Sequence, residues 1–308
     1  MYYCEFDSEF NNGWLGEFEN LRALFETPAG SGIETVSEPE LDERVAEGLA
    51  TPVETHPWDM AERLHREGVC PYERLTVWRQ DANNCAGHGT NRAVEAFQLI
   101  SAWKKTRREL TPFESFVPWV WSVGKNESGN TGSGGATMGE MLGMIVRNGV
   151  LPADTPGLPD YRGTSNVWAK RYGKQSATAP YAKFWPEAKK YLVTAVQIPK
   201  DGGMFFDICK AGFSIAFGTS TQITRYGEDG KNQAWRVFGR WMHAMAAYGY
   251  DPVHDRIGID NSHGDGFAWA NRDVVRKVVD SAAYFDGFAI LDMIPRAGRA
   301  DWAPIGRL

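Results

Sequence analysis

Apolar and polar positions divide the chain into a first part with helical spacing and a second part with strand spacing. From Cys85 onward, apolar residues recur every three or four positions, at Ala93, Ala96, Phe97, Ile100 and Trp103. This spacing predicts an amphipathic helix of about five turns that begins at Cys85. A second helix is predicted over residues 138–147, where Asn148-Gly149 supplies a stop signal. A shorter helix is expected over residues 61–67, and a loop over the Gly-, Ser- and Asn-rich residues 124–135.

The apolar runs become short and strand-like after residue 191. They cover residues 192–196, 213–217, 242–250, 256–259 and 284–293. A further short extended segment is expected over residues 75–78. Helices that come first and strands that come later, without regular alternation, predict an α+β fold with an antiparallel sheet.

Charge separates the beginning of the chain from the rest. Residues 1–55 hold thirteen acidic side chains and two arginines, a balance of −11, so the remaining residues carry about +5 (−6 minus −11). We therefore expect an acidic N-terminal arm over residues 1–55 and a main domain over residues 56–308. The arm either packs on the main domain, contacts other subunits of a larger assembly, or is simply a solvated surface region.

Composition argues against several classes of partner. No basic cluster is interleaved with aromatic residues, so we expect no nucleic-acid partner. No apolar run approaches the roughly 18–20 residues of a membrane span, and the first residues lack the pattern of a secretory signal. The four cysteines, at positions 4, 70, 85 and 209, form no CxxC motif. Reduced thiols in the cytoplasm are therefore expected, and no metal or other cofactor.

Three residues carry the candidate chemistry. Cys85 opens the long predicted helix, His243 opens a strand-like run 158 residues later (243 − 85), and Asn261 follows after 18 more (261 − 243). A thiol needs a base to become a thiolate, and the base needs a third group that orients its ring. A helix N-terminus also favours a negatively charged sulfur. The order Cys, His, Asn thus predicts nucleophilic catalysis by Cys85.

Other polar residues near these three have weaker claims. The backbone N–H of Cys85 and the side-chain amide of Gln80 are candidate donors to an oxyanion. His88 and His263 could act as further bases, although surface or substrate-contact roles are expected for both. The spacing of His254, Asp260, His263 and Asp265 matches no compact metal-ligand motif.

At this point the chain resembles the papain-like cysteine peptidase family. Gln80 to Ala93 is similar to the family's nucleophile block, and residues 134–150 resemble its double-glycine turn, helix and Gly-apolar exit. Residues 243–250 resemble its His-Ala-x-x-x-x-Gly-Tyr strand, and Asn261-Ser262-His263-Gly264 its Asn-Ser-Trp-Gly turn. The short Cys-Ala-Gly-His form resembles members from bacteria and bacteriophages.

The resemblance implies a papain-like fold of two lobes, helical over about residues 75–180 and sheet-rich over about 190–295. It implies that Cys85 is the nucleophile, His243 the base and acid, Asn261 the orienting residue and Gln80 an oxyanion donor. Backbone groups of Gly134 and Gly135 would pair with an extended polypeptide substrate. His263 replaces the family's tryptophan, so an aromatic shield over the Asn–His bond is expected to be missing.

Three functions follow as hypotheses. The first is a cysteine peptidase or related amide hydrolase that works through an acyl-enzyme. The second is a papain-fold structural or binding component of a larger assembly, such as a phage virion, in which the three residues persist without proteolysis. The third, a peptidoglycan amidase with the same residue order, is less favoured because such domains usually have shorter Cys-to-His spacings.

Overall fold

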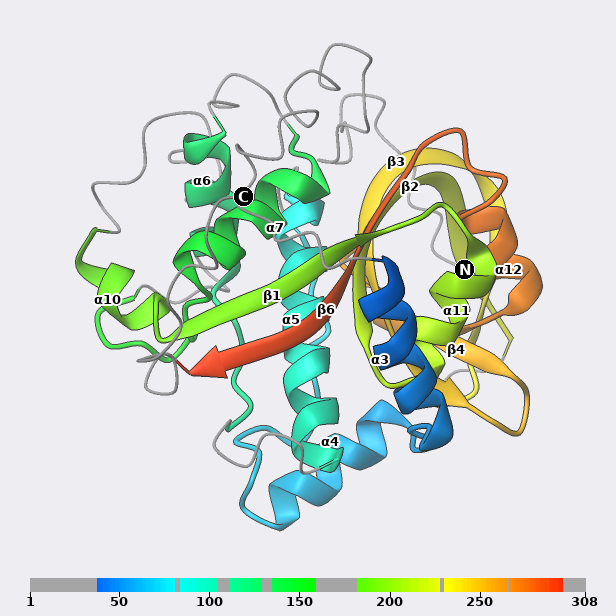
Figure 1. Ribbon diagram of the computed structural model, residues 1–308, viewed down its shortest axis with the longest axis horizontal. Helices are drawn as coiled ribbons and strands as arrows, with labels where there is room; N and C mark the ends of the chain where they lie inside the picture. Colours follow the sequence, from blue (N-terminus) through cyan, green and yellow to red (C-terminus); the bar gives the residue numbers. More distant parts are fainter. Residues whose placement is uncertain are drawn as a thin grey trace.

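The computed structural model describes residues 38–80, 84–104, 111–128, 135–158, 182–227, 230–264 and 266–295 (Figure 1). Its helices are α3 (Glu38–Ala50), α4 (Pro57–Arg66), α5 (Cys85–Lys104), α6 (Val117–Glu127), α7 (Met138–Asn148), the 3-10 turn η1 (Ala182–Phe184), α10 (Trp185–Ala188), α11 (Gly202–Lys210) and α12 (Arg272–Val278). Its strands are β1 (Tyr191–Ile198), β2 (Ser214–Tyr226), β3 (Ala234–Asp251), β4 (Arg256–Asn261), β5 (Gly266–Asn271) and β6 (Phe285–Pro295). The α+β prediction is confirmed.

The two strongest helix predictions are confirmed almost to the residue. α5 begins at Cys85, as its hydrophobic spacing indicates. α7 begins with a capping box, in which Thr137 and Glu140 satisfy each other's backbone N–H groups. It ends at Gly149, whose positive φ of 80° is one that a residue with a side chain rarely adopts.

Two expectations about the helical lobe are wrong. Gly124 to Glu127 were predicted as loop but form the last turn of α6. Gly124 is accommodated there because the Met141 side chain of α7 occupies the space a Cβ would need. Residues 75–78 are irregular and do not form a strand, and the extended contact comes one residue later, in a single bridge between Arg79 and His263.

Among the described residues, six strands form one sheet in the order β1-β6-β2-β3-β4-β5. Neighbouring strands are antiparallel, and β3 bends far enough for its first residue, Ala234, to pair in parallel with Trp269 of β5. All five predicted strands are present, although β2 and β3 extend well beyond their apolar runs. β5 was not predicted.

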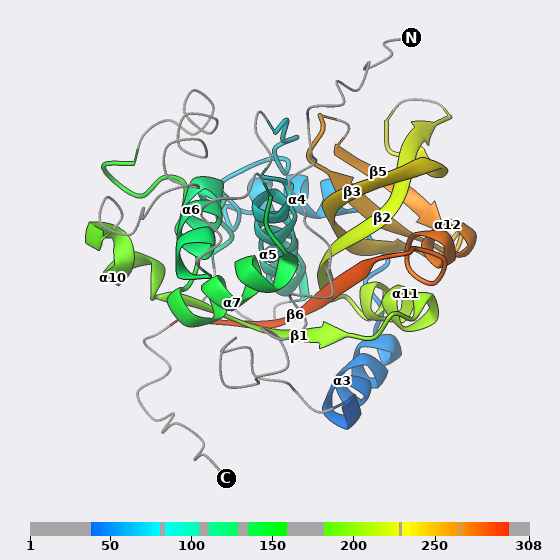
Figure 2. The ribbon, with the colours of Figure 1, turned by 90° about the horizontal axis from the view of Figure 1, so that it is seen from above.

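Helices cover both faces of this sheet (Figure 2). α5, α6 and α7 share one core with the inner face, whereas α3, α11 and α12 share a second core with the outer face. Along β3 the residues alternate between these cores: Ala244 and Ala246 belong to the first, Met245 and Ala247 to the second. The sheet therefore holds β3 directly against α5 (Figure 1).

A glycine sets how closely α5 and β3 approach. A Cβ on Gly89, one turn after Cys85, would lie 2.8 Å from the carbonyl oxygen of Met245. Backbone thus contacts backbone at this point, which only glycine permits. The start of α5 is consequently fixed beside the part of β3 that carries His243.

Part of the acidic segment packs on the sheet lobe. Leu41 and Val45 of α3 are buried in the outer core, and Gly48 lies against Ala211 at the end of α11. The boundary at residue 55 stays a prediction. No helix among the described residues is both long enough and apolar enough to cross a bilayer.

Candidate active site

Cys85 lies where the first turn of α5 contacts β3. Burial raises the pKa of its thiol to about 12, while the backbone N–H groups of Ala244, Ala86 and Cys85 itself lower it by facing the sulfur. Ala244 directly follows His243, so this N–H places the sulfur next to the histidine-bearing strand. In this closed arrangement the thiol is protonated at neutral pH, and donors to a thiolate are already in position.

His243 and Asn261 are brought together by neighbouring strands. The Nε2 atom of His243 is 2.8 Å from Oδ1 of Asn261, and both side chains are fully buried. The backbone N–H of His263 donates to the same Oδ1 atom at 3.2 Å. Because that N–H only donates, the atom is the amide oxygen, and Nε2 of His243 must carry a proton. In a neutral ring this leaves the lone pair on Nδ1.

Two aromatic rings pack against the imidazole of His243. The ring of Trp241 lies 4.5 Å from it and the ring of His263 lies 4.0 Å from it, centroid to centroid. His263 stands where the Asn-Ser-Trp-Gly motif has its tryptophan, and its ring packs beside His243. Trp241 adds a second ring. Two rings thus lie beside the imidazole of His243; whether they shield its bond to Asn261 stays a prediction.

Gln80 is attached to the turn that presents Asn261. Its side-chain Oε1 atom accepts a hydrogen bond from Ser262 Oγ at 2.7 Å, and its backbone N–H donates to the Ser262 carbonyl at 2.6 Å. Gly264 also donates to the carbonyl of Trp78 at 3.1 Å. The segment before α5 therefore runs beside residues 262–264. Because Oε1 is held by Ser262, the donor branch of the Gln80 amide is the one that points elsewhere.

The double-glycine position is only partly described. Gly134 lies outside the described residues. Gly135 is buried, and its carbonyl accepts a hydrogen bond from the buried Lys125 Nζ at 2.6 Å. A substrate-pairing role for Gly134 and Gly135 stays a prediction.

Of the other histidines near the site, His88 is buried and His263 is half-buried. His88 is buried beside Trp78, at 6.0 Å between ring centroids, and burial together with Arg92 lowers its pKa to about 3. Burial lowers the pKa of His263 to about 4. Both rings are neutral at pH 7. The expected surface role for His88 is therefore wrong, and His263 packs on the imidazole of His243. Within the described ranges, no group of three or more His, Cys, Asp or Glu side chains is arranged to hold a metal ion.

The comparisons with known proteins concern the fold. No family model matches the chain, and no curated relative matches it. A crystal structure of xylellain, a cysteine protease from Xylella fastidiosa, superimposes with a TM-score of 0.54 at 15% identity, covering 90% of this chain and 94% of that one. The procathepsin B S9 structure from Trypanosoma congolense gives a TM-score of 0.47 at 11% identity, covering 83% of this chain and 81% of that one. The chain has a papain-like fold.

Within this papain-like fold, three contributors to the site were not predicted from the sequence. Trp241 lies two residues before His243 on the same strand, and period-two spacing gave a signal for it. Ser262 holds Gln80, and nothing in the local pattern indicated that bond. Arg92, which pairs with Asp260 beside Asn261, follows Cys85 by seven residues (92 − 85), which places both on one face of α5.

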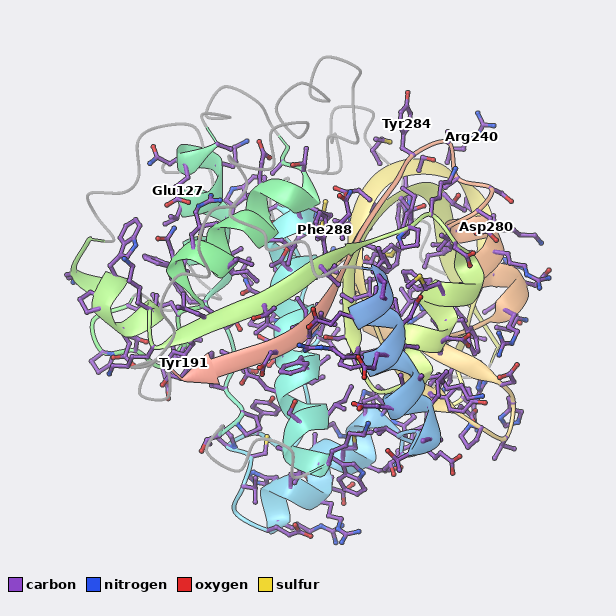
Figure 3. All side chains as sticks on the ribbon, viewed as in Figure 1. Glu127, Tyr191, Arg240, Asp280, Tyr284 and Phe288 are labelled. Carbon is purple, nitrogen blue, oxygen red and sulfur yellow. The ribbon has the colours of Figure 1, made fainter. Side chains whose placement is uncertain are left out.

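The outer end of β3 is open to solvent. Arg240 and Tyr284 project there from neighbouring parts of the sheet lobe (Figure 3). His243 follows Arg240 by three residues (243 − 240) and is fully buried, so the exposed part of β3 stops just before the candidate site.

Proposed function

We propose that the chain is a cysteine peptidase that hydrolyses peptide or amide bonds through a thiolate and an acyl-enzyme. The observation that carries the proposal is the His243–Asn261 bond of 2.8 Å next to the Ala244 N–H that faces the Cys85 sulfur. These contacts support the proposal because acyl transfer by a thiol needs a base beside it and a third group that orients the base.

The proposed reaction has two halves, acylation and deacylation, and His243 transfers protons in both. His243 Nδ1 takes the proton of Cys85, and the sulfur forms a bond to the substrate carbonyl carbon. The oxyanion accepts hydrogen bonds from the Cys85 N–H and the Gln80 amide. Collapse breaks the C–N bond while the imidazolium gives its proton to the leaving amine. Water, deprotonated by the same imidazole, then attacks the thioester, and the acid product leaves as the thiolate reforms.

Thiolate formation requires a change in the surroundings of Cys85. Burial holds the thiol neutral in the closed site, whereas an imidazolium neighbour and admitted solvent lower its pKa. We infer that binding of an extended polypeptide accompanies this change. A reducing compartment such as the cytoplasm suits a catalytic thiol of this kind.

The decisive test is peptide cleavage with a matched pair of cysteine variants. Purified protein is incubated with a mixed fluorogenic peptide library, with and without a thiol-directed epoxide. We expect cleavage that the epoxide abolishes, that Cys85→Ala lacks, and that Cys209→Ala retains, since Cys209 is a buried core residue of α11. Equal, slow labelling of the cysteines together with no cleavage would contradict the proposal.

One observation favours the second candidate, a papain-fold component of a larger assembly such as a phage virion. Cys85 is fully buried, with its pKa raised to about 12, as suits a thiol that does no chemistry. Under this alternative the acidic N-terminal arm contacts other subunits. Stoichiometric co-purification in a particle, with unchanged assembly of Cys85→Ala and no cleavage, would support it.

Release of muropeptides from purified cell wall would instead indicate the third function, a peptidoglycan amidase.

A further inference from the structure

A buried ion pair joins the helix of Cys85 to the strand of Asn261. Arg92 lies on α5, about two turns after Cys85. Its Nε atom is 3.3 Å from Oδ2 of Asp260, and the two side chains are only 3% and 8% exposed. Asp260 directly precedes Asn261 at the end of β4. The pair therefore spans the two elements whose relative position sets the geometry of the site.

Further partners hold this pair in place. Tyr248 on β3 donates a hydrogen bond of 2.7 Å to the same Oδ2 atom of Asp260. Arg92 Nη1 lies 3.0 Å from Glu95 Oε2, and the other Glu95 oxygen accepts the Ser115 N–H at 2.8 Å. Each carboxylate is thus held by a second group, so the guanidinium is fixed between two anchored acids.

The network and the candidate site share a wall. A cavity of about 10 Å³, roughly the size of one water site, is lined by Arg92 and Asp260 together with Ala244 and Ser262. Ala244 supplies the N–H that faces Cys85, and Ser262 holds Gln80. A shift of Asp260 would therefore displace the surroundings of both Ala244 and Ser262.

We propose that Arg92 and Asp260 are positioning residues that hold Asn261 against His243 relative to Cys85. The inference rests on the proposed function only in assigning His243 as the base. Charges are costly to bury, and apolar residues of similar volume often stabilise a protein equally well. An ion pair between α5 and the residue before Asn261 supplies what apolar packing does not: a charge-specific constraint on the end of β4.

The test compares Asp260→Asn and Arg92→Lys with Ile208→Ala. Asp260→Asn keeps the shape of the side chain but removes its charge, and Arg92→Lys keeps the charge but loses the planar fork. Ile208 is a fully buried residue of the outer core, and its truncation lowers stability away from the site. If Arg92→Lys does not fold, the triple change Arg92→Met, Glu95→Gln and Asp260→Asn replaces it, because no buried charge is left without its partner.

Three measurements are made on each variant: kcat and KM for the best peptide, the pH profile of iodoacetamide alkylation of Cys85, and exchange of the His243 Nε2 proton by NMR. For Asp260→Asn we expect kcat to fall by about 10- to 100-fold with KM little changed. Alkylation near neutral pH should fall in parallel, and the Nε2 proton should exchange faster. Arg92→Lys should show a smaller change than Asp260→Asn in each of the three measurements. Ile208→Ala should lower the melting temperature and change none of the three.

The outcomes separate this inference from the proposed function. If the wild type cleaves peptides but Asp260→Asn matches Ile208→Ala in all three measurements, the network is merely structural and the inference is overturned. If the wild type cleaves nothing, yet the Nε2 proton exchanges faster in Asp260→Asn and Arg92→Lys but not in Ile208→Ala, the peptidase proposal fails and the positioning role stands. Unchanged exchange in every variant overturns the positioning role whatever the activity.

Discussion

The imidazole of His263 lies 4.0 Å from that of His243, centroid to centroid, at an angle of 39°. One ring belongs to the turn after β4 and the other to β3, so the contact places a second imidazole beside the ring that is bonded to Asn261. A tryptophan in this place has no charge at any pH, whereas a histidine becomes charged when the pH falls below its pKa. The packing of this ring on His243 therefore depends on pH.

We predict that the protein loses stability as the pH falls from about 6.5 to about 4. Burial lowers the pKa of His263 and of His56 to about 4, and that of His88 to about 3. Between 6.5 and these values the unfolded chain binds protons that the folded chain does not, so acid favours unfolding, and these three histidines cause no loss above pH 6.5.

The variant His263→Phe tests how much of this acid-dependent loss of stability comes from His263. It keeps a ring against His243 and removes one titrating group, so we expect its melting temperature at pH 5 to exceed that of the wild type by about 5 °C. At pH 8 the two proteins should agree within about 2 °C. An equal difference at both pH values would show that packing, not protonation, is responsible.

The sequence predicts best those features that arise from local spacing. α5 and α7 follow from period, cap and stop residues, and the candidate set Cys85, His243 and Asn261 follows from motif and chain order. By contrast, the last turn of α6 could not be predicted, because glycine disfavours helix. Gly124 is suited to that turn only because the Met141 side chain of α7 occupies the space that a Cβ would need.

Features that depend on contacts between distant elements were not predictable. The pairing of Gln80 with Ser262 joins residues 182 positions apart (262 − 80), and the Arg92–Asp260 pair joins residues 168 apart (260 − 92). Each residue alone reads as an ordinary surface group. Only the sheet register and the packing of α5 on it bring the partners together.

We predict that Cys85 and Cys209 react differently although both are buried. Burial alone raises the pKa of Cys209, while at Cys85 three backbone N–H groups oppose the effect of burial. Iodoacetamide should therefore label Cys85 at least about tenfold faster at pH 7.5, measured by mass spectrometry of peptides. Guanidinium-unfolded protein is the control, in which the two rates should converge. Equal rates in the folded state would contradict the assignment of Cys85 as nucleophile.

Alkali should destabilise the fold through the same two thiols. Their pKa values are raised in the folded state, so the stability they contribute is complete below about pH 8.5 and is lost as the pH rises toward 12. Cys209→Ala should lose less stability than the wild type between pH 8.5 and pH 10.5, followed by urea unfolding. A parallel decline in both proteins would assign the effect to other groups.

Two glycines of α5 form a matched pair for testing the approach of helix and strand. A Cβ on Gly89 would meet Met245 backbone atoms at 2.8–3.1 Å, whereas one on Gly87 would meet Trp121 and Val117 side-chain atoms at 3.3–3.5 Å. Alanine gains up to about 1 kcal/mol in helix propensity at either site. Since backbone does not yield as side chains do, Gly89→Ala should lose a net 1–2 kcal/mol or so and most activity. Gly87→Ala should stay within about 1 kcal/mol of the wild type in urea unfolding.

Gln80 and Ser262 offer a graded test of the oxyanion donor. If the Gln80 amide stabilises the oxyanion, Gln80→Ala should lower kcat by about 100-fold with little change in KM. Ser262→Ala removes the 2.7 Å bond that orients the amide but leaves the donor itself, so its loss should be smaller, near tenfold. The double variant should be no worse than Gln80→Ala, because Ser262 acts only through Gln80. Additive losses, measured as kcat on one peptide, would show instead that Ser262 contributes independently of that bond, through the turn that carries Asn261.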